Sequence, residues 1–157
     1  MQQASMNHFK APKRSLGDLD AEVAATLIAA AADIALIVDD HGVITDLALG
    51  NDELSLEGCG EWLGQPWIST VTVESRPKVE AMLRDAAAKV TPKWRQINHT
   101  SALGRDLPVL YSIVPVGSKN DRIVAVGRDL RAVASLQQRL VGAQQSMDKE
   151  YARLRHL

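Results

Sequence analysis

Apolar residues near the end of the chain recur at alternating steps of three and four, the pattern of a helix that pairs with another helix. With residue 133 at the first core position of a heptad, the two core positions are filled by Val133, Leu136, Leu140, Ala143, Met147, Glu150, Leu154 and Leu157. Seven of these eight residues are apolar. The pattern therefore predicts a coiled-coil linker helix over residues 131–157, and its high glutamine content indicates a solvated outer surface. The alternative is a single amphipathic helix that lies across the open face of its own domain.

The start of the chain divides into a polar arm and a helix. Residues 1–15 are polar and basic and predict a flexible arm. Residues 16–32 are rich in alanine, carry acidic residues near their start and predict a helix. Leu19, Val23 and Leu27 follow one another at steps of four and share one face of that helix. We expect this face to pack on a second copy of the chain.

Residues 33–130 contain both strand and helix patterns and predict one α+β domain. Short runs rich in β-branched residues, bounded by Gly, Asp and Asn turns, indicate strands over 34–38, 43–47, 93–100, 107–116 and 122–129. Short helical turns are expected around 61–67, and a helix is expected over 77–88, where Pro77 lies in the first turn. These elements predict a five-stranded antiparallel sheet with helices on one face and a pocket between them and the sheet.

Composition and charge argue against two classes of function, binding to nucleic acid and binding to membranes. The chain has 157 residues, 46% of them hydrophobic and 24% charged, with a formal net charge of −1. A net charge so close to zero does not predict the excess of positive charge that binding to nucleic acid or to an anionic membrane requires. No apolar run is long enough to span a membrane, so we expect no membrane contact and a cytoplasmic location.

His99 and Trp62 are the candidate ligand contacts. His99 alternates with Ile97 and Arg95 on a predicted strand, so its imidazole could bind haem iron or a polar group in the pocket. The simpler interpretation is a histidine whose ring nitrogens are satisfied by protein groups. Trp62 could form a wall of a haem or flavin pocket, or it could supply bulk to a small core.

The other chemistry-bearing residues favour a protein that is not an enzyme. Cys59 is the single cysteine and lies between glycines and acidic residues, which predicts an exposed but unreactive thiol. The histidines and Cys59 have no local metal-ligand spacing, so we expect no metal site. No acid-base or nucleophilic constellation is apparent. We expect no bound cofactor, with haem or flavin as the group to test for.

The segments AADIALIV (31–38), HGVI (41–44), EWLGQP (61–66), INH (97–99) and, above all, GRDLRAVASLQQRLVGAQQSM (127–147) point to a family. The chain resembles the N-terminal domain and Gln-rich linker of the PpsR/CrtJ repressors, and more generally it looks like a PAS sensor domain. In PAS domains an Asp-hydrophobic-Thr junction couples the last strand to a helix. Asp129 and Leu130 match that junction, and Arg131 replaces the threonine.

The resemblance implies a redox- or light-responsive repressor of photosynthesis genes, of which this chain is the sensory and oligomerisation module. It implies a homodimer or higher homo-oligomer, an antirepressor protein as a further partner, and DNA contact only through a C-terminal helix-turn-helix absent from this sequence. A heptad pattern that runs to Leu157 indicates that the natural chain continues. The alternative is a haem- or flavin-binding PAS input domain of another signalling protein, such as a kinase or a cyclase.

Overall fold

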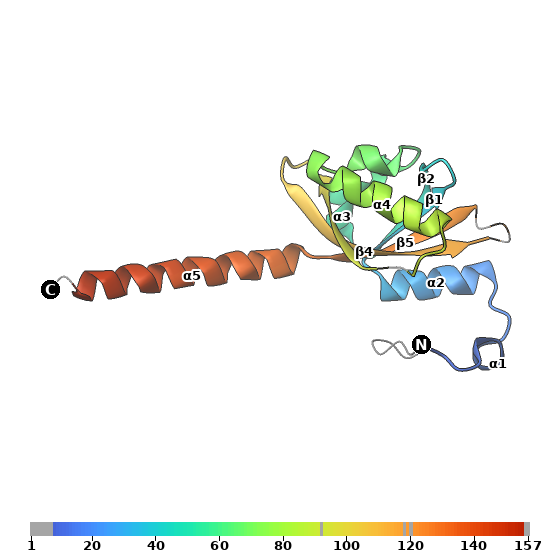
Figure 1. Cartoon of the computed structure of the whole chain (residues 1–157), viewed down its shortest axis with the longest axis horizontal. Coiled ribbons are helices and arrows are strands. Elements are labelled where there is room, and N and C mark those ends of the chain that lie inside the picture. Colours follow the sequence, from blue (N-terminus) through green and yellow to red (C-terminus); the bar gives the residue numbers. More distant parts are fainter. Residues whose placement is uncertain (1–7, 92, 118, 120, 156–157) are drawn as a thin grey trace.

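Five antiparallel strands form one sheet, and helices lie on both of its faces (Figure 1). The computed structural model describes residues 8–91, 93–117, 119 and 121–155. The strands are β1 (Ile34–Asp39), β2 (Ile44–Leu49), β3 (Arg95–Thr100), β4 (Asp106–Val116) and β5 (Arg122–Asp129), in the spatial order β2-β1-β5-β4-β3. The predicted α+β class and five-stranded antiparallel sheet are therefore confirmed.

The helices divide between the two faces of the sheet. They are α1 (Pro12–Leu16), α2 (Ala21–Ala31), α3 (Asp52–Leu56), α4 (Arg76–Ala87) and α5 (Arg131–Arg155), with single 3₁₀ turns at Cys59–Trp62, Trp67–Thr70 and Val73–Ser75. Helices α3 and α4 cover one face, and α2 lies on the opposite face (Figure 1). We call these the inner and the outer face of the sheet.

The N-terminal elements differ from the sequence prediction. Residues 1–7 of the expected arm lie outside the described residues, and Pro12–Leu16 form the short helix α1 rather than a loose segment. The predicted helix over 16–32 is interrupted at Gly17, whose φ of +67° favours glycine. Helix α2 starts only at Ala21, because the Asp20 carboxylate caps it by accepting a hydrogen bond from the Val23 backbone N–H (2.8 Å).

The core fills the space between the inner face and the helices above it. Strand alternation places Leu36, Ala125 and Ile113 side by side across three neighbouring strands, and all three are buried. Trp67 meets the edge of Tyr111 at a ring-centroid distance of 5.4 Å. Large aromatic side chains therefore occupy much of the volume in which a pocket was predicted.

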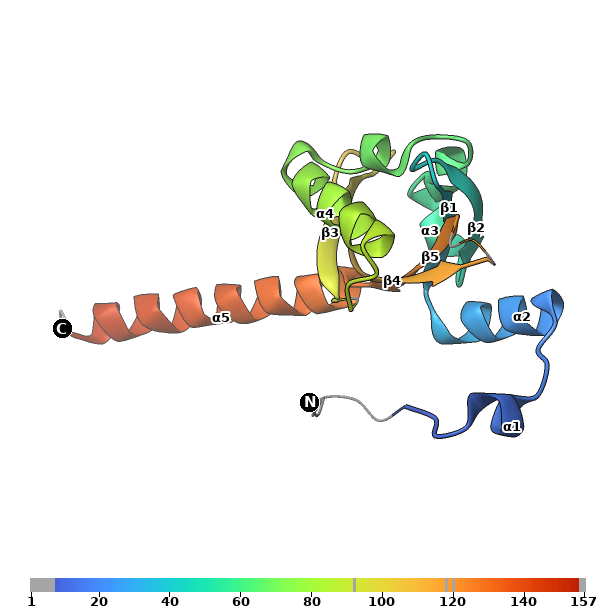
Figure 2. The same cartoon turned by 45° about the vertical axis from the view of Figure 1, so that its right-hand side comes forward.

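Helix α5 leaves the sheet at the end of β5 and extends away from the domain (Figures 1 and 2). Its 25 residues correspond to a rod about 37 Å long at the usual helical rise. Only its start lies against the body of the domain in both views. The alternative in which the helix lies across the sheet is therefore not the arrangement observed.

We predict that Gly127→Ala destabilises the domain by about 1–3 kcal/mol, because overpacking a filled core costs free energy. An added Cβ would lie 2.6 Å from Ile34 Cγ2, 2.7 Å from Val109 Cγ1 and 2.8 Å from Tyr111 Cε1. Urea unfolding followed by circular dichroism measures the effect. Gly60→Ala is the matched control, because a methyl group there meets open space. Equal stability of the two variants would contradict the packing described.

Candidate functional site

The connection between β5 and α5 is held by an ion pair between Asp129 and Arg131. The Arg131 guanidinium donates from Nε (2.8 Å) and Nη2 (2.6 Å) to Asp129 Oδ2, and the Arg131 backbone N–H donates to Asp129 Oδ1 (3.0 Å). Such short contacts between a guanidinium and a carboxylate fix geometry as well as charge. The last residue of the strand therefore sets the conformation of the first residue of the helix.

Glu57 is the buried centre of the same network. Its side chain is only 2% exposed, and its Oε1 accepts hydrogen bonds from Arg131 Nη1 (3.2 Å) and Arg105 Nη2 (3.4 Å). Its Oε2 accepts a hydrogen bond from the Ser101 hydroxyl. This hydrogen bond and the charge of Arg105 hold the pKa of Glu57 below its usual value of 4.5, against the opposing effect of burial. The group is therefore a carboxylate that two guanidinium groups neutralise.

Local backbone structure explains why Glu57 can reach Arg131. Glu57 caps the C-terminus of α3, where its backbone N–H donates to the Leu54 carbonyl oxygen (3.2 Å). The next residue, Gly58, has φ of +89°, and a Cβ there would lie 2.9 Å from the Cβ of Ala102. The Ala102 N–H donates to the Glu57 carbonyl oxygen (3.0 Å). The chain after α3 is thus held against the turn between β3 and β4.

Asp33 connects the N-terminal side of the domain to this junction. It follows α2 and precedes β1, and its Oδ2 accepts a hydrogen bond from the Asp129 N–H (2.8 Å). Its own N–H donates to the Gly127 carbonyl oxygen (3.0 Å). The end of α2 and the start of α5 therefore lie close together, where the adjacent interior strands β1 and β5 begin and end.

His99 belongs to a separate, fully buried cluster. The Trp62 ring stacks on its imidazole at 3.9 Å between centroids. His99 Nδ1 lies 3.2 Å from the Thr70 carbonyl oxygen, an acceptor, so we assign the ring proton to Nδ1. His99 Nε2 then accepts a hydrogen bond from the Tyr111 hydroxyl (2.7 Å). Both ring nitrogens are used, so a bond to haem iron would require loss of one of these contacts.

Cys59 is buried, which corrects the expectation of an exposed thiol. Its flanking glycines do not expose it, because the 3₁₀ turn that it begins packs against the core. Burial, together with the charge of Glu57, raises the pKa of the Cys59 thiol to about 12. The thiol is therefore protonated and unreactive, as its acidic surroundings indicate.

The structure places the predicted site residues in three separate regions. Asp129 and Arg131 meet at the junction, and His99 and Trp62 meet in the core. The residues predicted to pair copies are all exposed, with Leu19 just before α2 and the others on α2 and α5; they are Leu19, Val23, Leu27, Val133, Leu136, Leu140, Ala143, Met147 and Leu154. Leu157, at the end of the heptad pattern, lies outside the described residues. Sequence reasoning missed Glu57, Ser101, Arg105 and Asp33, because no local pattern links residues so far apart in the chain.

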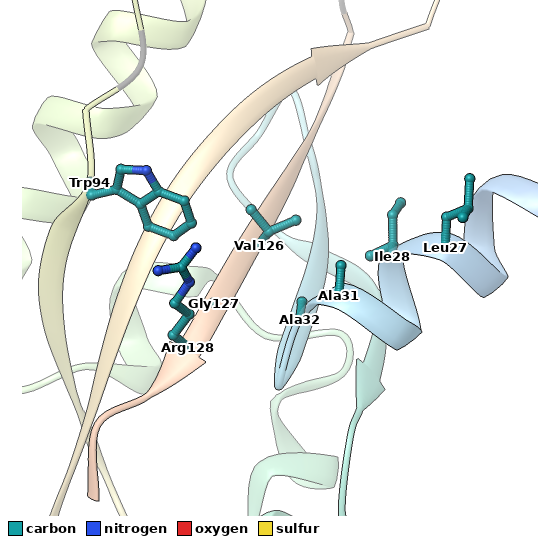
Figure 3. Close-up of a pocket in the computed structure, with 8 residues that line it drawn as sticks. All are labelled: Leu27, Ile28, Ala31, Ala32, Trp94, Val126, Gly127 and Arg128. Atoms are coloured by element: carbon teal, nitrogen blue, oxygen red, sulfur yellow. The ribbon is translucent and has the colours of Figure 1, made fainter. Parts of the chain in front are cut away.

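An apolar groove of about 360 Å³ lies on the outer face of the sheet, beside α2 (Figure 3). Leu27, Ile28, Ala31 and Ala32 form one wall, Val126 and Gly127 form the floor, and Trp94 and Arg128 form the other wall. The Arg128 guanidinium lies over the Trp94 ring at 4.7 Å from its centroid. This groove combines an apolar surface with one cation at its edge.

Among the described residues, no three His, Cys, Asp or Glu side chains group as a metal site. None of the helices so described is long and apolar enough to cross a membrane.

Comparison with solved structures identifies the class of fold as a PAS domain. The PAS domain of a protein from Colwellia psychrerythraea superposes with a TM-score of 0.55 and 18% identity, covering 69% of this chain and 94% of that one. A domain of a sensory box sensor histidine kinase/response regulator from Geobacter sulfurreducens gives 0.54 and 19%, covering 70% and 97%.

Among curated proteins, the chain is similar to Protein CrtJ of Rhodobacter capsulatus. The two are 27% identical over 149 residues, which cover 95% of this chain and 31% of CrtJ. The chain thus spans about a third of the length of this relative. No protein-family model matches the chain. The chain therefore has a PAS fold and is similar in sequence to CrtJ, which confirms the resemblance predicted from the sequence.

We predict that Glu57→Gln lowers the free energy of unfolding at pH 7 by about 1–3 kcal/mol, because two arginines lose a buried anionic partner. The pKa of Glu57 is lowered by folding, so its carboxylate stabilises the fold above about pH 4.5, and this contribution is lost as the pH falls further. The difference between variant and wild type should therefore shrink in acid. Urea unfolding between pH 7 and pH 3 measures it.

Glu53→Gln is the control for this experiment. Glu53 also faces Arg131, at 3.6 Å, but its side chain is 78% exposed, so its loss should cost less than about 1 kcal/mol. A Glu57→Gln variant that is no less stable than Glu53→Gln would show that the buried carboxylate does not hold the junction.

We also predict that the His99 ring signals in NMR spectra do not shift between pH 8 and pH 5. Burial lowers the pKa of His99 from its usual 6.5 to about 3, so the folded protein keeps this ring neutral. Because the unfolded chain takes up this proton near pH 6.5, His99 also makes the fold less stable as the pH falls from 6.5 toward 3. A His99 titration midpoint between pH 6 and pH 7 would contradict this environment.

Proposed function

We propose that the chain is the sensory and assembly module of a PpsR/CrtJ-like transcriptional regulator, and that α5 pairs copies of the protein. The observation that carries this proposal is a 25-residue helix that projects from a PAS domain with its apolar stripe exposed. Similarity to CrtJ over 95% of the chain supports the kind of protein to which the module belongs.

The exposed stripe argues for a partner helix. Leu136, Leu140 and Leu154 are between half and two-thirds exposed, and they are spaced by whole or partial heptads. Apolar side chains held in water along a rod are stabilised when a second stripe covers them, and two copies of one heptad pattern supply complementary stripes. A second copy of α5 is therefore the partner that we propose.

The junction argues for coupling between the sheet and that helix. Arg131 contacts Asp129 at the end of β5 and Glu57 below α3, so a shift of either element changes the direction in which α5 begins. The contacts of Asp129 and Glu57 also raise the pKa of Arg131, so the link stays charged. If two copies of α5 are paired, a small change in the angle or register of the helix at its start would be transmitted to any segment that follows it.

The specific regulatory role that we propose is based on the resemblance to the PpsR/CrtJ repressors. We propose a redox- or light-responsive repressor of photosynthesis genes, with an antirepressor protein as a partner and with DNA bound by a segment absent from this sequence. We propose that the module itself is not an enzyme and that it acts in the cytoplasm as a homodimer or higher homo-oligomer.

We predict that Leu140→Asp converts the chain from an oligomer to a monomer at about 10 µM, because two carboxylates would face each other at a core position of the paired helices. Size-exclusion chromatography with light scattering measures the mass. Gln138→Asp is the matched control, since position 138 is on the outer side of the same heptad and should leave the oligomer intact. A Leu140→Asp protein that keeps the wild-type mass would reject pairing through α5.

A further inference from the structure

One core position of the α5 heptad pattern is occupied by a charged residue. Glu150 takes the second core position of its heptad, whereas the other core residues between 133 and 154 are valine, leucine, alanine or methionine. Its side chain is 65% exposed, and its Oε1 lies 3.5 Å from Nη1 of Arg153, whose side chain is 72% exposed. An ion pair so open to solvent contributes little free energy. Arg153 therefore leaves most of this carboxylate available to a partner helix.

Pairing of α5 with a second copy is unfavourable at this position. In a parallel coiled coil of identical helices, equivalent core residues face each other, so Glu150 of one copy faces Glu150 of the other. Leucine layers such as those of Leu140 and Leu154 are stabilised in this arrangement, whereas two facing carboxylates repel each other and lose solvent. The self-paired helix is therefore weakest at the layer of Glu150.

The charge of Glu150 indicates which partner helix removes this cost. A lysine or arginine opposite Glu150 replaces the repulsion by a charge-assisted hydrogen bond. The neighbouring core residues Met147 and Leu154 are apolar, so such a contact is less exposed to solvent and salt than one on an open surface. All other core positions from 133 to 154 are uncharged, so selection of a partner by charge depends on this one residue.

We propose that Glu150 makes the heptad core of α5 selective for a partner helix that has the same apolar heptads and a lysine or arginine facing Glu150. A polar core residue of this kind lowers the stability of one pairing and favours another. Pairing with a second copy is then the weaker of two modes. This selectivity rests on the proposed function, because it requires that α5 pairs through its heptad core, and it names the partner chemistry that the same surface prefers.

Mixing the full wild-type chain with a Glu150→Lys chain tests this selectivity, because the lysine variant stands in for a basic partner. Native mass spectrometry distinguishes the pairs when the variant is labelled with ¹⁵N. After exchange at equimolar concentration, we expect about 90% of the pairs to be mixed, against about 50% for random mixing, because mixed pairs are about tenfold tighter. Far-UV circular dichroism checks that each variant is folded.

Two further variants separate a local contact from general charge attraction. Asp148→Lys is the matched control, because it makes the same change of charge at position 148, outside the heptad core. Its mixture with wild type should stay close to random. Glu150→Leu should pair with itself about tenfold more tightly than wild type does, because an apolar layer replaces two facing carboxylates.

The possible outcomes separate this proposal from the proposed function. Random mixing of paired wild type with Glu150→Lys overturns the selectivity and leaves pairing through α5 intact. An equal excess of mixed pairs with Asp148→Lys also overturns it, because general attraction between the chains then accounts for the result. If wild type, Glu150→Lys, Glu150→Leu and the mixtures are all monomeric up to about 1 mM, α5 does not pair, and both proposals are rejected.

Discussion

One guanidinium group joins three parts of the molecule. Arg131 is the first residue of α5. It contacts Asp129, the last residue of β5, and the buried Glu57, which caps the C-terminus of α3. A buried carboxylate is costly unless it is paired, so Glu57 stabilises the fold only while Arg131 and Arg105 face it. The direction of α5 and the stability of the segment that follows α3 therefore depend on the same contacts.

This arrangement brings both flanking helices together where β1 begins and β5 ends. Asp33, which follows α2, accepts a hydrogen bond from the backbone N–H of Asp129. The Asp129 carboxylate in turn accepts a hydrogen bond from the backbone N–H of Arg131. The exposed apolar stripes of α2 and α5 are thus connected through a few polar residues. A perturbation in the PAS core that moves Glu57 would affect both stripes, which is the route from sensing to assembly that we propose.

The sequence predicts the strands and the long helix well, because period-two and heptad patterns are local properties. It also identifies Asp129 and Arg131, since they are close in the chain. Glu57, Ser101 and Arg105 could not be found in this way, because their proximity arises only when the sheet closes. The burial of Cys59 could not be predicted for a related reason. Glycines on both sides indicate an exposed loop, whereas packing against the core buries the turn.

The measurement that tests the coupling most directly is the distance distribution between spin labels at Gln138→Cys in paired chains, where the buried Cys59 should not react. We expect one narrow distance for the wild-type junction and a broader or shifted distribution when Arg131 is replaced by glutamine. The same narrow distribution in both proteins would show that Arg131 does not set the direction of α5, and it would contradict the account of the junction given above.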